Sequence, residues 1–197
     1  MNDHRSWTEL CSRRFVLGGA CALAATTCAS LPVRADGPPD AARGMLAQAG
    51  DQFVAYGSED GGASLAVSDI HLNSDVVLAW PVDTARHVIR NASRLNLIIL
   101  MHFDPSSLSA QETARAVDGV VAFTAVCSHQ ACWVTDWLAS KQLLQCPCHQ
   151  SEYDLRQGGK VVSGPAPRGL AGLPLKVADG KLVVAGPFTD RVGGQKL

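Results

Sequence analysis

The sequence predicts an all-β fold in which short antiparallel strands form a sandwich or a barrel. From about residue 52 onward, short apolar runs are separated by residues that favour turns. The dipeptides Asp118-Gly119 and Asp179-Gly180 are strong turn signals between such runs. Gly (18) and Pro (10) are slightly more frequent than average, which is typical of many strands joined by many turns.

Seven apolar runs are expected to form the strands, and the last two of them should pair as a hairpin across Asp179-Gly180. The expected strands are residues 53–56, 76–80, 95–102, 120–126, 143–145, 173–178 and 182–185. One helix is expected at residues 109–117, where Ser107 or Ser109 could cap the first turn and Glu112 follows.

The first 35 residues are typical of an export signal. Arg13 and Arg14 form a twin-arginine pair, and the apolar stretch at 15–31 has 17 residues, fewer than the ~20 of a spanning helix. A small-x-small site for cleavage ends at Ala35. We therefore expect export of the folded protein to the periplasm by the twin-arginine route. The alternative is an uncleaved segment that anchors the protein to the inner membrane.

The rest of the chain divides into a linker and one domain. Residues 36–51 are expected to form a linker or a short helix at 41–49 that does not pack tightly. Residues 52–197 are expected to form the domain.

The charge distribution argues against a nucleic-acid-binding protein. The formal net charge is −1, and the sequence contains no basic run and no pattern of stacking aromatic residues. No overall field therefore favours nucleic acid or an anionic membrane surface.

The chemistry of the chain is concentrated in two boxes rich in cysteine and histidine. Box one, residues 127–132, reads Cys-Ser-His-Gln-Ala-Cys, and box two, residues 146–153, reads Cys-Pro-Cys-His-Gln-Ser-Glu-Tyr. Each box offers one Cys and one His that could reach a common metal centre, and each contains one additional Cys. Both boxes follow predicted strands, so they lie in loops on a rigid scaffold.

Other uses of these residues fit the spacing poorly. Structural zinc sites favour Cys-x-x-Cys and His-x3–5-His spacings, which neither box contains. Covalent haem attachment requires Cys-x-x-Cys-His, and box two lacks one residue of that motif. A single catalytic thiol would not explain two paired boxes.

The two boxes resemble those of Rieske 2Fe–2S proteins of the cytochrome bc type, and residues 163–167 resemble the proline loop that covers the cluster in that family. The resemblance implies a Rieske-type β fold with a small cluster-binding subdomain formed by two loops at about residues 125–168. It implies that Cys127 and Cys146 hold one iron, and that His129 and His149 hold the other. The remaining cysteines, Cys132 and Cys148, would form a disulfide. The proline loop would comprise Gly164, Pro165, Ala166 and Pro167.

The resemblance also assigns hydrogen-bonding roles around the cluster. Ser151 matches a serine whose hydroxyl bonds a bridging sulfide, and Tyr153 matches a tyrosine whose hydroxyl bonds the sulfur of a ligand cysteine. Such donors stabilise the more negative reduced cluster, so a high reduction potential is expected. The chain departs from the family at Gln130-Ala131, where Leu-Gly is common, and at Gln150, which replaces a common Gly.

These features predict an exported one-electron carrier, most simply the small iron–sulfur subunit of a periplasmic oxidoreductase that resembles arsenite oxidase. The first alternative is the Rieske subunit of a membrane quinol–cytochrome c reductase, and the second is a Rieske ferredoxin of an oxygenase. The expected partner is a redox protein, either a large oxidoreductase subunit or a cytochrome, with a quinol as a further candidate. The protein alone is not expected to turn over a substrate.

Overall fold

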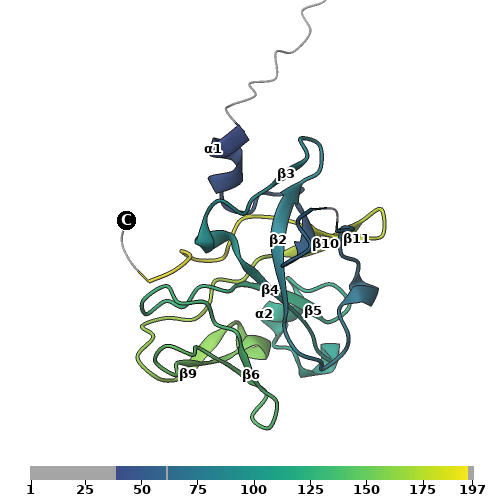
Figure 1. Ribbon diagram of the computed structural model, residues 1–197. Coiled ribbons are helices and arrows are strands. Elements are labelled where there is room, and N and C mark those ends of the chain that lie inside the picture. Colours follow the sequence, from purple (N-terminus) through teal and green to yellow (C-terminus); the bar gives the residue numbers. More distant parts are fainter. Residues whose placement is uncertain (1–38, 61, 195–197) are drawn as a thin grey trace, which may run out of the picture. The chain divides into compact units, whose positions relative to one another are not determined.

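The computed structural model describes residues 39–60 and 62–194 (Figure 1), so the expected export signal lies outside the described residues. A seven-stranded sheet has the order β10-β11-β1-β2-β4-β5, with β3 paired to β2, and every pairing is antiparallel. The predicted all-β antiparallel class is therefore confirmed. The strands of this sheet are β1 (Gln52–Ala55), β2 (Val77–Asp83), β3 (Val88–Ile89), β4 (Ile98–His102), β5 (Val120–Thr124), β10 (Leu175–Ala178) and β11 (Lys181–Val184).

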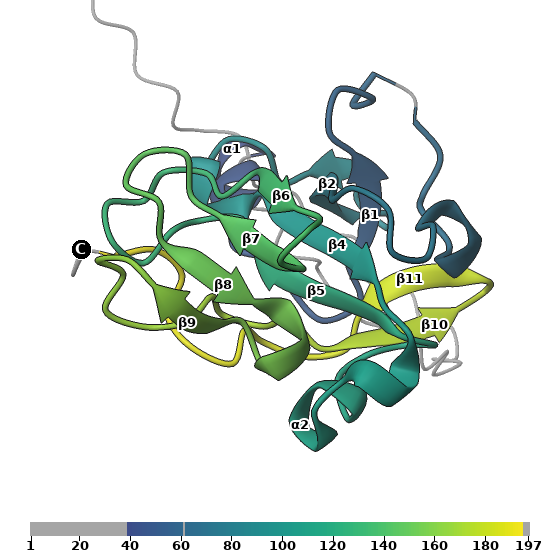
Figure 2. The ribbon, with the colours of Figure 1, turned by 90° about the horizontal axis from the view of Figure 1, so that it is seen from below.

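A second, four-stranded antiparallel sheet lies between β5 and β10 in the sequence. Its order is β6-β7-β8-β9. Its strands are β6 (Asp136–Leu138), β7 (Leu143–Gln145), β8 (Glu152–Asp154) and β9 (Lys160–Ser163). Figure 2 shows this smaller sheet lying over β4 and β5.

The central strands β4 and β5 are buried on both faces. Alternate residues, such as Ile99 and Phe123, pack into a core that also contains Leu144 from the smaller sheet. Their neighbours, such as Ile98 and Ala122, pack into a second core on the opposite face. Burial on both faces explains why these strands appear in the sequence as continuous apolar runs. The two loops that carry the boxes extend from this double-sided core.

The helices of the described residues are short. They are α1 (Pro39–Gly44), α2 (Ala110–Thr113) and four single 3-10 turns, η1 (Val67–Asp69), η2 (Arg94–Asn96), η3 (Pro105–Ser107) and η4 (Leu155–Gln157). Ser109 caps α2 through a 3.3 Å hydrogen bond from Glu112 N to its hydroxyl, so the helix begins where predicted but is shorter than expected. Within residues 39–60 and 62–194, no helix has the length and apolar character needed to cross a membrane.

Residues 42–51 are mostly exposed, but specific contacts join them to the domain. Asp51 is 3% exposed and accepts two hydrogen bonds, of 2.6 and 2.9 Å, from Arg90, which is equally buried. The same guanidinium donates to the carbonyl oxygen of Ala42 at 2.9 Å. A buried arginine distant in sequence thus fixes this segment to the domain.

Candidate metal centre

Box one forms a tight loop, called loop one (residues 127–132), directly after the buried strand β5. The amide of Cys127 donates to the carbonyl of Cys132 at 2.8 Å, and the amide of Ala131 donates back to the carbonyl of Cys127 at 3.1 Å. Ala131 has a φ of 56°, in the left-handed region. The loop therefore closes on itself and buries Cys127, which is 1% exposed, in the core between the sheets.

Box two forms a loop of the same kind, called loop two (residues 146–151), between β7 and β8. The amide of Cys146 donates to the carbonyl of Ser151 at 2.9 Å, and the amide of Gln150 donates to the carbonyl of Cys146 at 2.9 Å. Gln150 has a φ of 58°. At Ala131 and at Gln150, a non-glycine residue holds the left-handed conformation that Gly favours.

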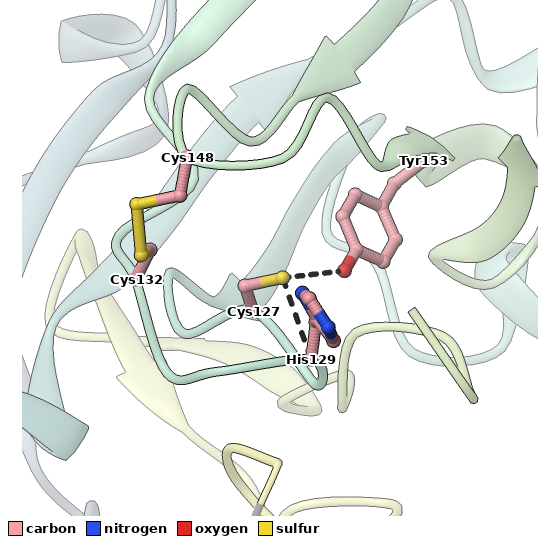
Figure 3. Close-up of a disulfide and its surroundings, with 5 residues drawn as sticks. All are labelled: Cys127, His129, Cys132, Cys148 and Tyr153. Carbon is pink, nitrogen blue, oxygen red and sulfur yellow. Dashed lines mark hydrogen bonds between the residues drawn. A yellow bond between two sulfur atoms is a disulfide. The ribbon is translucent and has the colours of Figure 1, made fainter. Parts of the chain in front are cut away.

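The two inner cysteines, Cys127 and Cys146, are buried free thiols whose side chains interact with each other. Burial and the proximity of Cys127 raise the pKa of the Cys146 thiol, while backbone amides of Cys148 and His149 act in the opposite direction. The hydroxyl of Tyr153 lies 3.1 Å from Cys127 Sγ, and Figure 3 marks this hydrogen bond with a dashed line. Burial raises the pKa of Tyr153, so this hydroxyl remains protonated and can donate.

The two box histidines face each other. The rings of His129 and His149 have centroids 4.7 Å apart and are inclined by 84°. His149 is exposed and His129 is half-buried. The Nδ1 atom of His129 is buried and has no hydrogen-bond partner among the described residues. A buried ring nitrogen without a partner is costly unless something else, such as a metal ion, satisfies it.

The outer cysteines, Cys132 and Cys148, form a disulfide that ties loop one to loop two across a sequence separation of 16 residues (Figure 3). The sulfur atoms of Cys132, Cys146 and Cys148 lie within 4.8 Å of one another. They are not a ligand set, because two of them are bonded to each other and have no thiolate to offer. Of the four cysteines in the two boxes, only the inner pair keeps free thiols for a metal.

The proline loop (residues 163–167) packs closely on loop two. The amide of Ala166 donates to the hydroxyl of Ser151 at 3.1 Å. A Cβ at Gly164, where φ is 91°, would lie 2.5 Å from the Cα of Ser151, so only Gly fits. Ser151 is fully buried, and its oxygen accepts from the proline loop, which leaves its own hydrogen free to donate elsewhere.

Two residues near the site have no signal in the sequence. Ser128 lies inside box one and is 1% exposed, and its hydroxyl donates to the carbonyl of Arg168 at 2.5 Å. Arg168 directly follows the proline loop. Their contact could not be predicted from the local motif, because it joins segments that are 40 residues apart.

The donor set fits a 2Fe–2S cluster of mixed ligation. Such a cluster requires two thiolates and two imidazole nitrogens, and the two loops bring together Cys127, Cys146, His129 and His149. The unpartnered His129 Nδ1 is a direct sign of this fit.

Comparison with known proteins identifies a matching family and several similar chains. Residues 108–174 match the model of the Rieske [2Fe-2S] domain family. The chain is 36% identical over 149 residues to the cytochrome b6-f complex iron-sulfur subunit of Synechococcus elongatus, covering 76% of each chain. It is also 36% identical over 104 residues to the cytochrome bc1 complex Rieske iron-sulfur subunit of Mycobacterium tuberculosis, covering 50% of this chain and 24% of that one.

Among solved structures, the soluble domain of Rieske protein II from Sulfolobus acidocaldarius matches with a TM-score of 0.36 and 24% identity. The match covers 45% of this chain and 61% of that one.

Proposed function

Since the chain belongs to the Rieske iron–sulfur protein family and carries a 2Fe–2S cluster, we propose that it is the electron-transfer subunit of a cytochrome bc-type complex. Cys127 and Cys146 would hold one iron, and His129 and His149 the other. The cluster would accept and release one electron at a time at a relatively high potential, because neutral imidazoles replace two thiolates.

The observation that carries this proposal is the environment of His129 Nδ1. This nitrogen is buried without a partner, and the ring of His149 lies beside it with a centroid separation of 4.7 Å. An ordinary structural histidine would donate or accept at this position. A pair of imidazoles next to two buried thiols is instead the arrangement that a mixed-ligand iron–sulfur centre needs.

The surrounding side chains favour the reduced state. The hydroxyl of Tyr153 and the amide of His129 both point at Cys127 Sγ, at 3.1 and 3.5 Å. Donors to a ligand sulfur stabilise added negative charge and so raise the reduction potential. The free hydrogen of Ser151 is available for a bond of the same kind. We therefore expect a midpoint in the upper part of the Rieske range.

His149 is the proposed site of electron exchange with the partner. It is exposed, and the neighbouring residues Pro147, Cys148 and Gln150 are exposed as well, whereas His129 is half-buried. A redox partner can therefore approach the imidazole of loop two most closely.

The relatives favour the bc-type subunit over the arsenite-oxidase-like subunit that the export signal suggested. The match to a cytochrome b6-f subunit extends over three quarters of both chains, and the tyrosine and proline loop agree with this choice. Gln130 is exposed in loop one, where a redox partner is expected to dock. It is polar, whereas the resemblance to the family implies Leu at this position. Purification from native membranes tests the choice: a b-type cytochrome should accompany the chain, and a large molybdenum subunit would reverse it.

The export route remains a prediction, since the twin-arginine pair and the cleavage site precede the described residues. N-terminal sequencing of the exported protein tests it. A first residue near Asp36 is expected for a cleaved signal, and an intact N-terminus would favour a membrane anchor.

Electron paramagnetic resonance during a potentiometric titration tests the ligand assignment. Wild-type protein should give a Rieske signal with a midpoint in the upper part of the range from about −150 to +300 mV. His129→Ala and His149→Ala should lose this signal, while the control His71→Ala, at an exposed histidine outside the site, should keep it. A midpoint near about −400 mV, typical of ligation by cysteine alone, would contradict the proposal.

A further inference from the structure

Arg168 connects three segments that surround loop one. Its carbonyl oxygen accepts a hydrogen bond from Ser128 in loop one, and its own position is directly after the proline loop. Its guanidinium donates through Nη1 to the carbonyl of Arg191 at 2.8 Å and through Nη2 to the carbonyl of Gly193. One residue thus links loop one, through its backbone carbonyl, and the C-terminal segment (residues 187–194), through its guanidinium, to the end of the proline loop.

The C-terminal segment is held in place along its length. The amide of Thr189 donates to the carbonyl of Gly172 at 2.9 Å, and the Thr189 hydroxyl accepts from the amide of Gly172 at the same distance. Val192 is 9% exposed. Figure 2 shows the yellow segment leaving β11 and running to the side of the domain where the smaller sheet lies.

The end of this segment lies directly against the backbone of loop one. A methyl group at Gly194 would collide with the carbonyl oxygens of Ser128 and His129. At Gly193, a Cβ would lie 3.5 Å from Val126 and 4.0 Å from Ala131. Two glycines therefore allow the segment to touch the part of loop one that carries His129.

Loop two has no matching support. Residues 147–150 are all exposed, and among the described residues loop two contacts its own backbone, the proline loop and, through the disulfide, Cys127 and His129, loop one. The C-terminal segment therefore restrains one of the two histidine-bearing loops and leaves the other accessible.

We propose that Arg168 is a positioning residue, which holds the C-terminal segment against Ser128 and His129 and so fixes the orientation of the His129 imidazole. This inference rests on the proposed function, because it assigns a purpose to the orientation of a proposed ligand. Arginine suits the role since two nitrogens of its planar fork donate to two carbonyl oxygens at once, whereas all three donors of a lysine ammonium are on one nitrogen.

The test compares Arg168→Gln and Arg168→Lys with the control Arg43→Gln in the full-length, cluster-loaded protein. Arg43 is also a hydrogen-bonded arginine, but its guanidinium contacts Asn91, away from both loops. One measurement is the line width of the paramagnetic resonance signal, which broadens when ligand orientations become heterogeneous. The other is hydrogen exchange of peptides that cover loop one and loop two.

Arg168→Gln should broaden the signal and speed amide exchange in loop one by about tenfold, through local opening, with loop two unchanged. Arg168→Lys should fall between this variant and wild type, because it keeps the charge but loses the fork. Widths and exchange rates equal to those of Arg43→Gln would overturn the proposal.

A second variant decides the matter even if Arg168→Gln fails to fold. Gly194→Ala should lift the C-terminal segment from loop one while leaving Arg168 and every charge in place, and it should loosen loop one selectively. Equal loosening of both loops, or of neither, would overturn the inference. If wild-type protein gives no Rieske signal, the proposed function fails, while loop-one exchange in the same variants still tests the positioning role.

Discussion

Loops one and two adopt the same backbone turn in different surroundings. In each, the amide of the inner cysteine donates to the carbonyl of the residue five positions later. The amide of a left-handed residue, four positions after the cysteine, donates to the carbonyl of that cysteine. Loop one, however, is supported by Arg168 and the C-terminal segment, while most of loop two is exposed. The local sequence thus sets the turn, and distant segments determine which histidine a partner can reach.

Removing the disulfide should have the largest effect, because it breaks the covalent link between the two loops. A closed loop of this size contributes about 3 kcal/mol to stability by restricting the unfolded chain. The double variant Cys132→Ala/Cys148→Ala should therefore melt about 6–12 °C below wild type. Calorimetry under non-reducing conditions measures this difference.

The same variant distinguishes the two loops. Loop two should lose more of its protection against hydrogen exchange than loop one, since the C-terminal segment still supports loop one. Wild-type protein in reducing agent serves as the control and should behave like the variant. An unchanged melting temperature, or equal loss of protection in both loops, would show that the disulfide does not account for the order of loop two.

The two inner thiols also differ in their hydrogen-bond donors. Cys127 Sγ faces the hydroxyl of Tyr153, whereas the donors to Cys146 are backbone amides of Cys148 and His149. A side-chain donor can be removed by substitution, so the loop-one thiol offers a direct test.

Tyr153→Phe should lower the reduction potential while the cluster remains bound. A net hydrogen bond of about 0.5–1.5 kcal/mol corresponds to about 20–65 mV for one electron. Protein-film voltammetry measures the shift. Tyr56→Phe is the matched control, since Tyr56 is an exposed tyrosine that packs on Trp80 and Trp133 and not on a ligand. If the reduction potential shifts equally in Tyr153→Phe and Tyr56→Phe, the hydroxyl of Tyr153 has no specific effect on the cluster.

Much of the scaffold could be predicted because its signals are local. Strands β4 and β5 are apolar on both faces, and the Asp-Gly turns at 118–119 and 179–180 show the expected positive φ values at both residues. The strand predicted at 95–102 begins late, at Ile98, because Ser93 caps the 3-10 turn η2 in front of it. A polar side chain that bonds the backbone locally competes with the extended state.

The strands that were missed are short and lack a clear apolar run. β9 reads Lys-Val-Val-Ser and has exposed ends, and β8 contains two acidic residues around Tyr153. These strands form because β7 and the boxes place them side by side, so tertiary context prevails over local propensity. The same reason explains why Ser128, Arg168 and the buried Arg90–Asp51 pair could not be predicted: each contact joins segments at least 39 residues apart.

The smallest predicted effect concerns the left-handed residue of each loop. A non-glycine residue in this conformation costs about 1–2 kcal/mol, and replacing it by Gly costs about 0.4–1 kcal/mol through the greater freedom of the unfolded chain. Gln150→Gly, in the exposed loop, should therefore stabilise the protein by about 0.5–1 kcal/mol. Ala131→Gly should gain less, because Ala131 is half-buried and the substitution removes a partly buried methyl group, whereas Gln150 is exposed.

Urea denaturation of the cluster-free protein measures both changes, with Ala139→Gly as the control. Ala139 is exposed and its φ is not positive, so Gly there should destabilise the protein by about 0.4–1 kcal/mol. If Gln150→Gly destabilises the protein as much as Ala139→Gly does, the turn of loop two is not strained. If Ala131→Gly and Gln150→Gly give equal gains, the partial burial of the Ala131 methyl group contributes nothing to the stability of loop one.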